Sequence, residues 1–235
     1  MAIEKSGATS VRAAFVQEIE DQILSGALQP GDRLPPAKEL CAQMGVSLTV
    51  VNAGVSELVT KGFLTVKPRH GTYVADWREN GSAETLMSVL RHNGGKLTQH
   101  DVRSYCESRV ALDPFVAELV IRRASNEQLK ALGAHVERVR AAETTEALCA
   151  AATDFFHRMY QLSDNTILSL LYHSTIPPQR HMYAQFIEKN GGEMIKTHIQ
   201  EVYTLLCLRD TEAVKQALIT AQRMPLEGKT AIVSI

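Results

Sequence analysis

The chain has 235 residues, of which 45% are hydrophobic and 22% charged, a composition typical of folded globular proteins and atypical of disordered ones. Its 25 lysines and arginines against 26 aspartates and glutamates leave a net charge of −1, which excludes a histone-like basic protein. Any contact with nucleic acid must therefore come from a local basic patch.

The sequence lacks the features of a membrane or secreted protein. No apolar run is long enough to cross a bilayer, and the first residues show no signal-peptide pattern. The four cysteines lie far apart and form no C-x-x-C pair. We therefore expect a cytoplasmic protein with reduced thiols rather than a zinc knuckle or a disulfide framework.

The first third of the chain predicts three helices followed by a hairpin. Ser10 can cap a first helix, a second helix covers residues 36–44, and Ser47 can cap a third. Gly45 allows a tight corner between the second and third helices. Two strands are expected over residues 63–66 and 72–75, with the basic segment 67–71 between them. This order is the layout of a winged helix-turn-helix, whose third helix enters the major groove.

The remainder of the chain predicts helix after helix. A polar segment over residues 77–83 shows no apolar periodicity and predicts a linker. The expected fold is therefore mostly α: an N-terminal winged helix-turn-helix over residues 1–76 and a C-terminal all-α bundle over residues 84–235.

Several motifs resemble those of GntR-family transcription regulators. The winged-helix part of the resemblance covers residues 23–35, 38–40, 45–47, 62–64 and 70–74. Residues 107–114 and 154–157 resemble motifs of the all-helical, FCD-type effector domain of the FadR-like subgroup. The resemblance implies a ligand-responsive regulator, not an enzyme, which binds a double-stranded DNA operator as a homodimer and senses a small metabolite, often a carboxylic acid. No nucleotide-binding, hydrolase or metalloprotease motif occurs in the sequence.

The resemblance places DNA contacts on the second helix, the third helix and the hairpin. The residues expected to bind DNA are Lys38, Ser47, Thr49, Asn52, Lys67, Arg69, His70 and Gly71. Lys61 is expected to join Lys67 and Arg69 in a basic cluster near the hairpin. The first 78 residues nevertheless carry eight basic and eight acidic side chains, so the overall positive field is weak.

The third helix departs from the family pattern. Leu48 and Asn52 stand where the family usually has arginine, and Gly54 costs about 1 kcal/mol of helix stability against alanine. We expect weaker or differently specific DNA binding, in which Asn52 can read adenine. Alternatively, Thr49 and Asn52 are only solvated. The chain would then be a metabolite- or metal-binding sensor, or an enzyme-like protein, whose helix has lost sequence specificity.

A metal site and a carboxylate site are both expected in the helical half. The resemblance implies a divalent transition metal such as zinc or nickel, and Asp154, His157 and His198 are the candidate ligands. No histidine occurs at residues 220–222, where a fourth ligand is expected, so the same histidines could instead be hydrogen-bonded pocket residues without a metal.

The guanidinium of Arg109 is the main candidate to bind a ligand carboxylate, because it can form two parallel hydrogen bonds. A salt bridge to Asp113, one helical turn later, is the alternative role, and the two roles are compatible. Arg103, Tyr160 and Arg180 are further candidates to line the same cavity.

Overall fold

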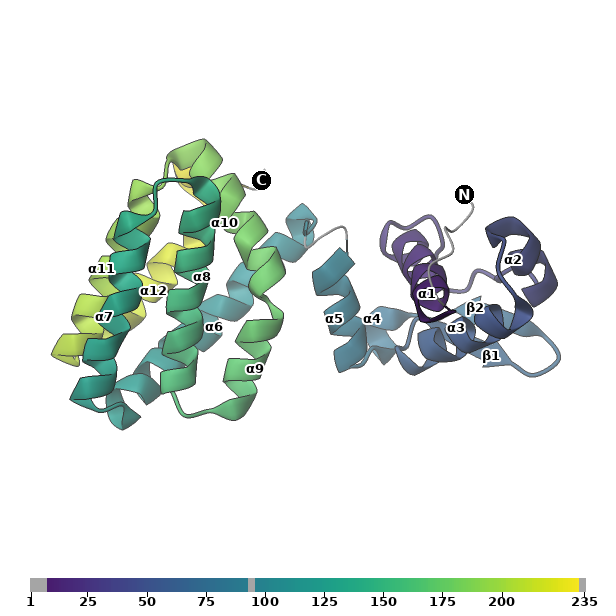
Figure 1. Cartoon of the computed structure of the whole chain (residues 1–235), viewed down its shortest axis with the longest axis horizontal. Coiled ribbons are helices and arrows are strands. Elements are labelled where there is room, and N and C mark those ends of the chain that lie inside the picture. Colours follow the sequence, from purple (N-terminus) through teal and green to yellow (C-terminus); the bar gives the residue numbers. More distant parts are fainter. Residues whose placement is uncertain (1–7, 93–95, 233–235) are drawn as a thin grey trace. The chain divides into compact units, whose positions relative to one another are not determined.

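The structure, a computed structural model, describes residues 8–92 and 96–232. The chain divides into two compact units, Met1–Asn93 and Gly94–Ile235, which are described separately below (Figure 1). In the described part of the chain, no helix combines the length and the apolar character that crossing a membrane requires.

The first unit begins as a winged helix-turn-helix, which confirms the predicted fold. Its elements are α1 (Ala8–Leu24), α2 (Ala37–Met44), α3 (Leu48–Thr60), β1 (Leu64–Lys67) and β2 (Gly71–Val74). The two strands pair antiparallel, with Leu64 opposite Val74 and Lys67 opposite Gly71. A core of fully buried side chains holds the helices and the hairpin together, and it includes Phe15, Val51, Leu58 and Phe63.

Local sequence signals set the turn between α2 and α3. Gly45 ends α2 with a positive φ of 66°, a left-handed conformation that glycine adopts without steric cost. Ser47 then caps α3 by accepting a hydrogen bond from the amide of Val50 at 3.3 Å. The amides of Leu48 and Thr49, at the start of α3, donate no intrahelical hydrogen bond and stay available to an anion.

The segment predicted as a linker is helical. Residues 77–83 contain α4 (Trp77–Asn80) and the start of α5 (Ala83–Arg91). Asp76 caps α4, and a capping box between Ser82 and Thr85 starts α5. The division between the two units therefore lies at residues 93 and 94, later than the predicted boundary.

Side-chain bonds attach α5 to the winged helix. The hydroxyl of Thr85 donates to the carbonyl of Lys61. Glu20, which is buried, accepts from Lys61 at 2.9 Å and from Ser88 at 3.0 Å. His92 pairs with Asp21 at 2.8 Å. These contacts hold α5 against α1 and the end of α3. The apolar periodicity of residues 77–83 alone did not indicate this packing.

The second unit is all-helical, as predicted. Its helices are α6 (Gln99–Arg123), α7 (Asn126–Ala141), α8 (Thr145–Leu162), α9 (Thr166–Ser174), α10 (Ile176–Asn190), α11 (Glu193–Leu208) and α12 (Thr211–Arg223), followed by a 3₁₀ turn at Gly228–Thr230. Helices α7, α8, α10 and α11 run side by side (Figure 1), and α6 packs along α12. Side chains such as Phe155, Met159 and Leu206 fill the core between them.

Candidate functional site

The exposed face of α3 is uncharged. Its exposed side chains are Leu48, Thr49, Asn52, Ser56, Val59 and Thr60. The only charged residue within the helix, Glu57, is partly buried and pairs with Arg12 at 3.4 Å and with Lys61 at 3.2 Å. The helix thus offers hydroxyl, amide and methyl groups to a partner, but no cation.

Lys61 does not belong to the expected basic cluster near the hairpin. Its ammonium group lies 2.9 Å from buried Glu20 and also contacts Glu57. Burial lowers the pKa of Lys61, but the hydrogen bonds and charges of these two carboxylates outweigh it, and the net shift is upward. Lys61 is therefore a structural cation that neutralises Glu20 beneath α5.

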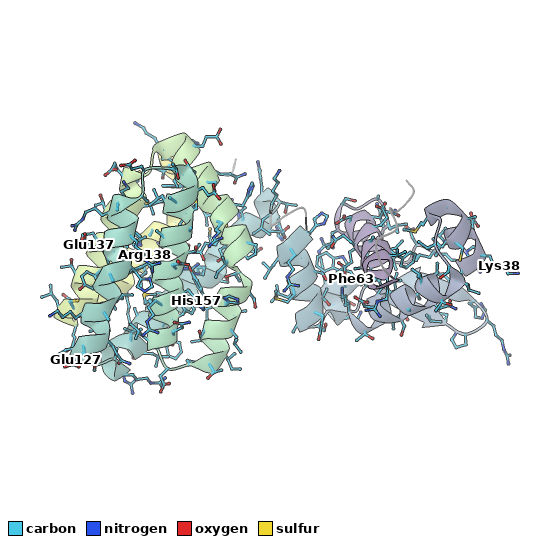
Figure 2. The ribbon with its side chains drawn as sticks, in the orientation of Figure 1. Lys38, Phe63, Glu127, Glu137, Arg138 and His157 are labelled. Carbon is cyan, nitrogen blue, oxygen red and sulfur yellow. The ribbon has the colours of Figure 1, made fainter. Side chains whose placement is uncertain are left out.

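The wing and α2 present further cations to solvent. Lys67 lies over the ring of Tyr73 with its Nζ 4.7 Å from the ring centre, and Arg69 and His70 are exposed at the turn. Lys38 is exposed on α2 (Figure 2). In residues 8–92, as far as the structure describes them, Lys38, Lys67 and Arg69 form no salt bridge.

Gly71 lets the wing turn lie close to another side chain. Its φ is 120°, and a Cβ there would come within 2.9 Å of the Nε of Arg33. The positive φ favours glycine at this position, and the absence of a Cβ leaves room for the Arg33 side chain.

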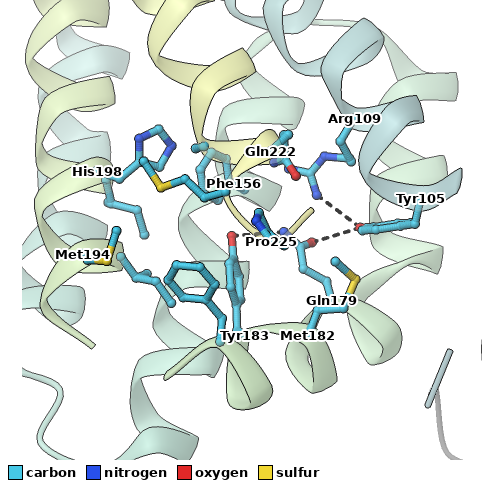
Figure 3. A pocket seen from close by; sticks show the side chains of 15 residues that line it. Tyr105, Arg109, Phe156, Gln179, Met182, Tyr183, Met194, His198, Gln222 and Pro225 are labelled. Atoms are coloured by element: carbon cyan, nitrogen blue, oxygen red, sulfur yellow. Dashed lines mark hydrogen bonds between the residues drawn. The ribbon is translucent and has the colours of Figure 1, made fainter. Parts of the chain in front are cut away.

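The second unit contains a cavity of about 60 Å³ between α6, α8, α10, α11 and the end of α12. Its polar lining residues are Tyr105, Arg109, Gln179, Tyr183, His198 and Gln222. Figure 3 shows Tyr105, Arg109 and Gln179 close together, with His198 set apart from them. Phenylalanine, methionine and isoleucine side chains form the rest of the wall, including Phe156, Met182 and Ile199. Such a mixture of apolar wall and few polar groups is typical of a small-molecule site.

Arg109 is the central charged group of this cavity. Its Nε donates to Asp113 at 2.7 Å and its Nη1 donates to the hydroxyl of Tyr105 at 3.1 Å (Figure 3 draws the second bond). Asp113 also accepts from Tyr160 at 2.6 Å and from Gln222 at 2.9 Å. The predicted salt bridge is present, yet the buried Nη2 of Arg109 has no partner among the described residues.

Aromatic rings surround the guanidinium. The rings of Tyr172, Phe156, Tyr105 and Tyr160 have their centres 5.0 to 5.9 Å from its central carbon. Burial alone would lower the pKa of Arg109, but the negative charge of Asp113 raises it above its ordinary value. Arg109 is therefore permanently charged, and cation–π contacts add to the stabilisation by Asp113.

His198 supplies the second unpaired nitrogen of the cavity. Its Nε2 is buried without a hydrogen-bond partner in the described structure, and its ring stacks on Phe156 with 6.2 Å between centres. Burial lowers the pKa of His198 to about 4, the nearby Asp113 opposes this shift, and the positive charge of Arg109 adds to it. The imidazole is therefore neutral at neutral pH.

The structure separates the predicted ligand-binding residues. Arg109 lines the cavity, and Tyr160 lies behind it on Asp113. Arg103 is exposed, and Arg180 donates from its Nε to Thr153 at 3.3 Å; neither lines the cavity.

Sequence reasoning missed Tyr105, Gln179 and Gln222, which the fold brings to the cavity. Two of them carried a signal. Tyr105 precedes Arg109 by one helical turn, and Gln222 falls in the segment 220–222, which was considered only as a place for a histidine.

The predicted metal ligands do not come together. Asp154 pairs with Arg138 at 3.4 Å on the surface, and His157 packs against Tyr172 and His173 (Figure 2 labels Arg138 and His157). His198 alone of the three lines the cavity. Across residues 8–92 and 96–232, no group of three histidine, cysteine or acidic side chains is arranged to hold a metal ion. The central cation of the cavity is instead the guanidinium of Arg109.

A winged helix-turn-helix followed by an all-helical unit that contains a polar-lined cavity is typical of DNA-binding transcription regulators. Comparison with known proteins gives the family. Residues 12–74 match "Bacterial regulatory proteins, gntR family", and residues 105–221 match the FCD domain. The chain belongs to the GntR family and carries an FCD domain.

The relatives found are regulators by name. One is the uncharacterized HTH-type transcriptional regulator Rv0494 of Mycobacterium tuberculosis, 31% identical over 66% of this chain and 62% of its own length. The matched segment is thus shorter than two thirds of that relative. The uncharacterized regulator YcbG of Bacillus subtilis is 24% identical over 83% of this chain and 79% of its own length.

A solved structure shares the fold. It is reported under the heading "Lar controls the expression of the Listeria monocytogenes agr system and mediates virulence". It aligns with this chain with a TM-score of 0.56 at 16% identity. The alignment covers 96% of this chain and 100% of that one.

Proposed function

We propose that this chain is a ligand-responsive transcription regulator. It binds an operator as a homodimer on two half-sites of a near-palindrome, in the cytoplasm, and senses a short carboxylic acid in the FCD cavity. The observation that carries the sensing role is a pair of buried nitrogens in one cavity, Arg109 Nη2 and His198 Nε2, neither of which has a hydrogen-bond partner among the described residues. An unsatisfied buried polar atom costs about 1–3 kcal/mol, and a ligand oxygen can supply the missing bonds.

The size of the cavity limits the effector. A volume of about 60 Å³ has room for about four to six water-sized groups. An acid of this size would place its carboxylate between Arg109 and His198 and its short alkyl group against the wall that includes Met182 and Ile199. Acetate, propionate, butyrate and lactate are suitable test compounds.

Charge balance makes binding of an anion depend on pH. Asp113 already neutralises Arg109, so a second carboxylate brings an unmatched negative charge into the cavity. His198 can match it by taking up a proton, and the bound anion then raises the pKa of His198 above its unliganded value of about 4. Proton uptake therefore accompanies binding.

We expect carboxylate affinity to fall as pH rises. At pH values between the His198 pKa of about 4 in the free protein and its higher pKa in the complex, few free molecules carry a protonated His198. Affinity should then drop by up to about tenfold per pH unit. Calorimetry on the full chain from pH 5 upward, in buffers of different ionisation enthalpy, measures both the affinity and the proton uptake.

The variant His198→Gln retains a polar side chain but cannot take up the proton. It should bind the same acids more weakly and with no pH dependence. The matching amides, which carry no charge, serve as the ligand control and should bind weakly at every pH. Equal binding of amides and acids, or an unchanged pH profile in the variant, would contradict the carboxylate assignment.

The exposed cations should supply affinity for any DNA sequence. Lys67→Ala and Arg69→Ala should each weaken binding to all duplexes alike and reduce the slope of log affinity against log salt by roughly 1 per half-site. Salt titration of a gel shift measures this slope. The control Lys130→Ala, at an exposed position of α7, should change neither quantity.

The same gel shift tests the regulator itself. Affinity without any salt dependence would exclude the phosphate contacts. Equal affinity for every duplex, together with tight acid binding, would instead favour a sensor whose α3 does not read DNA sequence. The uncharged exposed face of α3 is the observation that favours this alternative.

A further inference from the structure

The face that α3 turns to solvent has the chemistry of a reader of A·T base pairs. Leu48 and Asn52 are four residues apart, so they share one face of the helix, and Thr49 lies beside them. All three side chains are exposed, Leu48 at 48% of its surface. They occupy the first turns of α3, the part of a recognition helix that meets base edges.

The chemistry of these side chains discriminates among bases. A guanine in the major groove offers two acceptors, which are most often bound by arginine or lysine. Asparagine matches adenine, because its Nδ2 donates to N7 while its Oδ1 accepts from the N6 amino group. A leucine cannot form hydrogen bonds, but it can cover the C5 methyl group of thymine, which cytosine lacks.

Nothing else on α3 compensates for the missing cations. Glu57 is held by Arg12 and Lys61, and Lys61 at the end of the helix is bound to Glu20. Exposed cations near α3, such as Lys38, Lys67 and Arg69, lie on α2 and on the wing, and Arg33 is exposed beside Gly71 of the wing. They can contact phosphates, which carry no sequence information.

We propose that α3 selects A·T pairs in the operator, with Asn52 bound to an adenine and Leu48 packed on a thymine methyl group, and that it contacts no guanine. The proposal rests on the proposed DNA binding of the first unit. It assigns Leu48 a direct role in specificity.

Selection of duplexes with a randomised centre by the full chain, followed by affinity measurements on the enriched duplex, tests this proposal. The enriched half-site should contain an A·T run. Replacing the contacted adenine with 7-deazaadenine, which lacks the N7 acceptor, should weaken binding of the natural chain about tenfold and leave Asn52→Ala little affected. Replacing the contacted thymine with uracil removes only the methyl group, and should cost roughly threefold in the natural chain and nothing in Leu48→Ala.

Matched variants separate readout from folding. Thr60→Ala, on the exposed C-terminal turn of α3, should respond to both modified bases like the natural chain. Leu48→Arg adds the missing cation and should bring a guanine into the selected half-site. An enriched motif defined by G·C pairs, or equal loss on modified bases in the natural chain and both alanine variants, would overturn the A·T assignment alone. Failure to retain any duplex would overturn the proposed DNA binding with it.

Discussion

Replacing Asp113 with asparagine should lower the free energy of unfolding of the helical unit by about 3–5 kcal/mol. Asp113 is fully buried and is the only carboxylate in contact with the guanidinium of Arg109, as far as the described residues show. The asparagine amide leaves that buried cation without a matching charge. It also replaces an acceptor that serves Arg109, Tyr160 and Gln222. Thermal and denaturant unfolding of the full chain, followed by circular dichroism, measures the loss.

Two comparisons distinguish this effect from the general loss of a carboxylate. Glu118→Gln removes an acid on the same helix that pairs with Lys215 at the surface, and it should cost far less stability than Asp113→Asn, because solvent screens this pair. The double variant Arg109→Met with Asp113→Leu removes both charges and should lose less than the sum of the two single variants. A loss in Asp113→Asn no greater than that in Glu118→Gln would mean that Arg109 is not electrostatically dependent on Asp113.

Replacing Gly54 with valine should destabilise the winged helix by about 3 kcal/mol, although valine has the higher helix propensity. Gly54 is buried in the middle of α3, where it packs on the ring of Phe15 from α1. A Cβ at this position would lie 2.6 Å from Cε1 of Phe15, and the ring is fully buried and has no free space to move into. Unfolding measurements should show the loss, together with weaker DNA retention, because α3 must shift on α1.

A series at the same contact tests this reason. Gly54→Ala should lose less than Gly54→Val, because it adds only one carbon. Shrinking the ring with Phe15→Leu should make Gly54→Ala less harmful than it is alone. Ser56→Ala, on the exposed face of the same helix, should change stability by no more than about 0.5 kcal/mol. Increased stability in Gly54→Ala would show that Phe15 yields and that helix propensity decides the outcome.

Signals within a few residues predicted the local structure well. The capping serine at Ser47 and the tight turn at Gly45 both form as expected. Each depends on a side chain bonding its own backbone neighbours, or on a conformation that one residue type allows. The predicted linker differs because α5 forms side-chain hydrogen bonds with Glu20 and Lys61, which are far away in sequence.

The candidate functional residues also include some that the sequence indicated and some that only the fold brought together. The sequence motifs correctly indicated the family, and Arg109 does line the cavity, but the spacing of the motifs could not show which helix faces converge. The rotation of α8 turns Phe156 toward the cavity and His157 toward Tyr172, so the metal set does not form. The uncharged face of α3 could be anticipated from Leu48 and Asn52, but the inward pairing of Lys61 could not.

The sequence by itself determined the helices and hairpin of the winged helix-turn-helix and its cationic turn, because these follow from short-range periodicity, capping and glycine conformations. The class of the protein came from the resemblance of its motifs to those of the GntR family. Tertiary structure alone decided that Gly54 accommodates Phe15, that α5 belongs to the first unit, and that Arg109 and His198 share a cavity with unpaired nitrogens. Those features arise from contacts between residues distant in the chain, whose geometry no local pattern encodes.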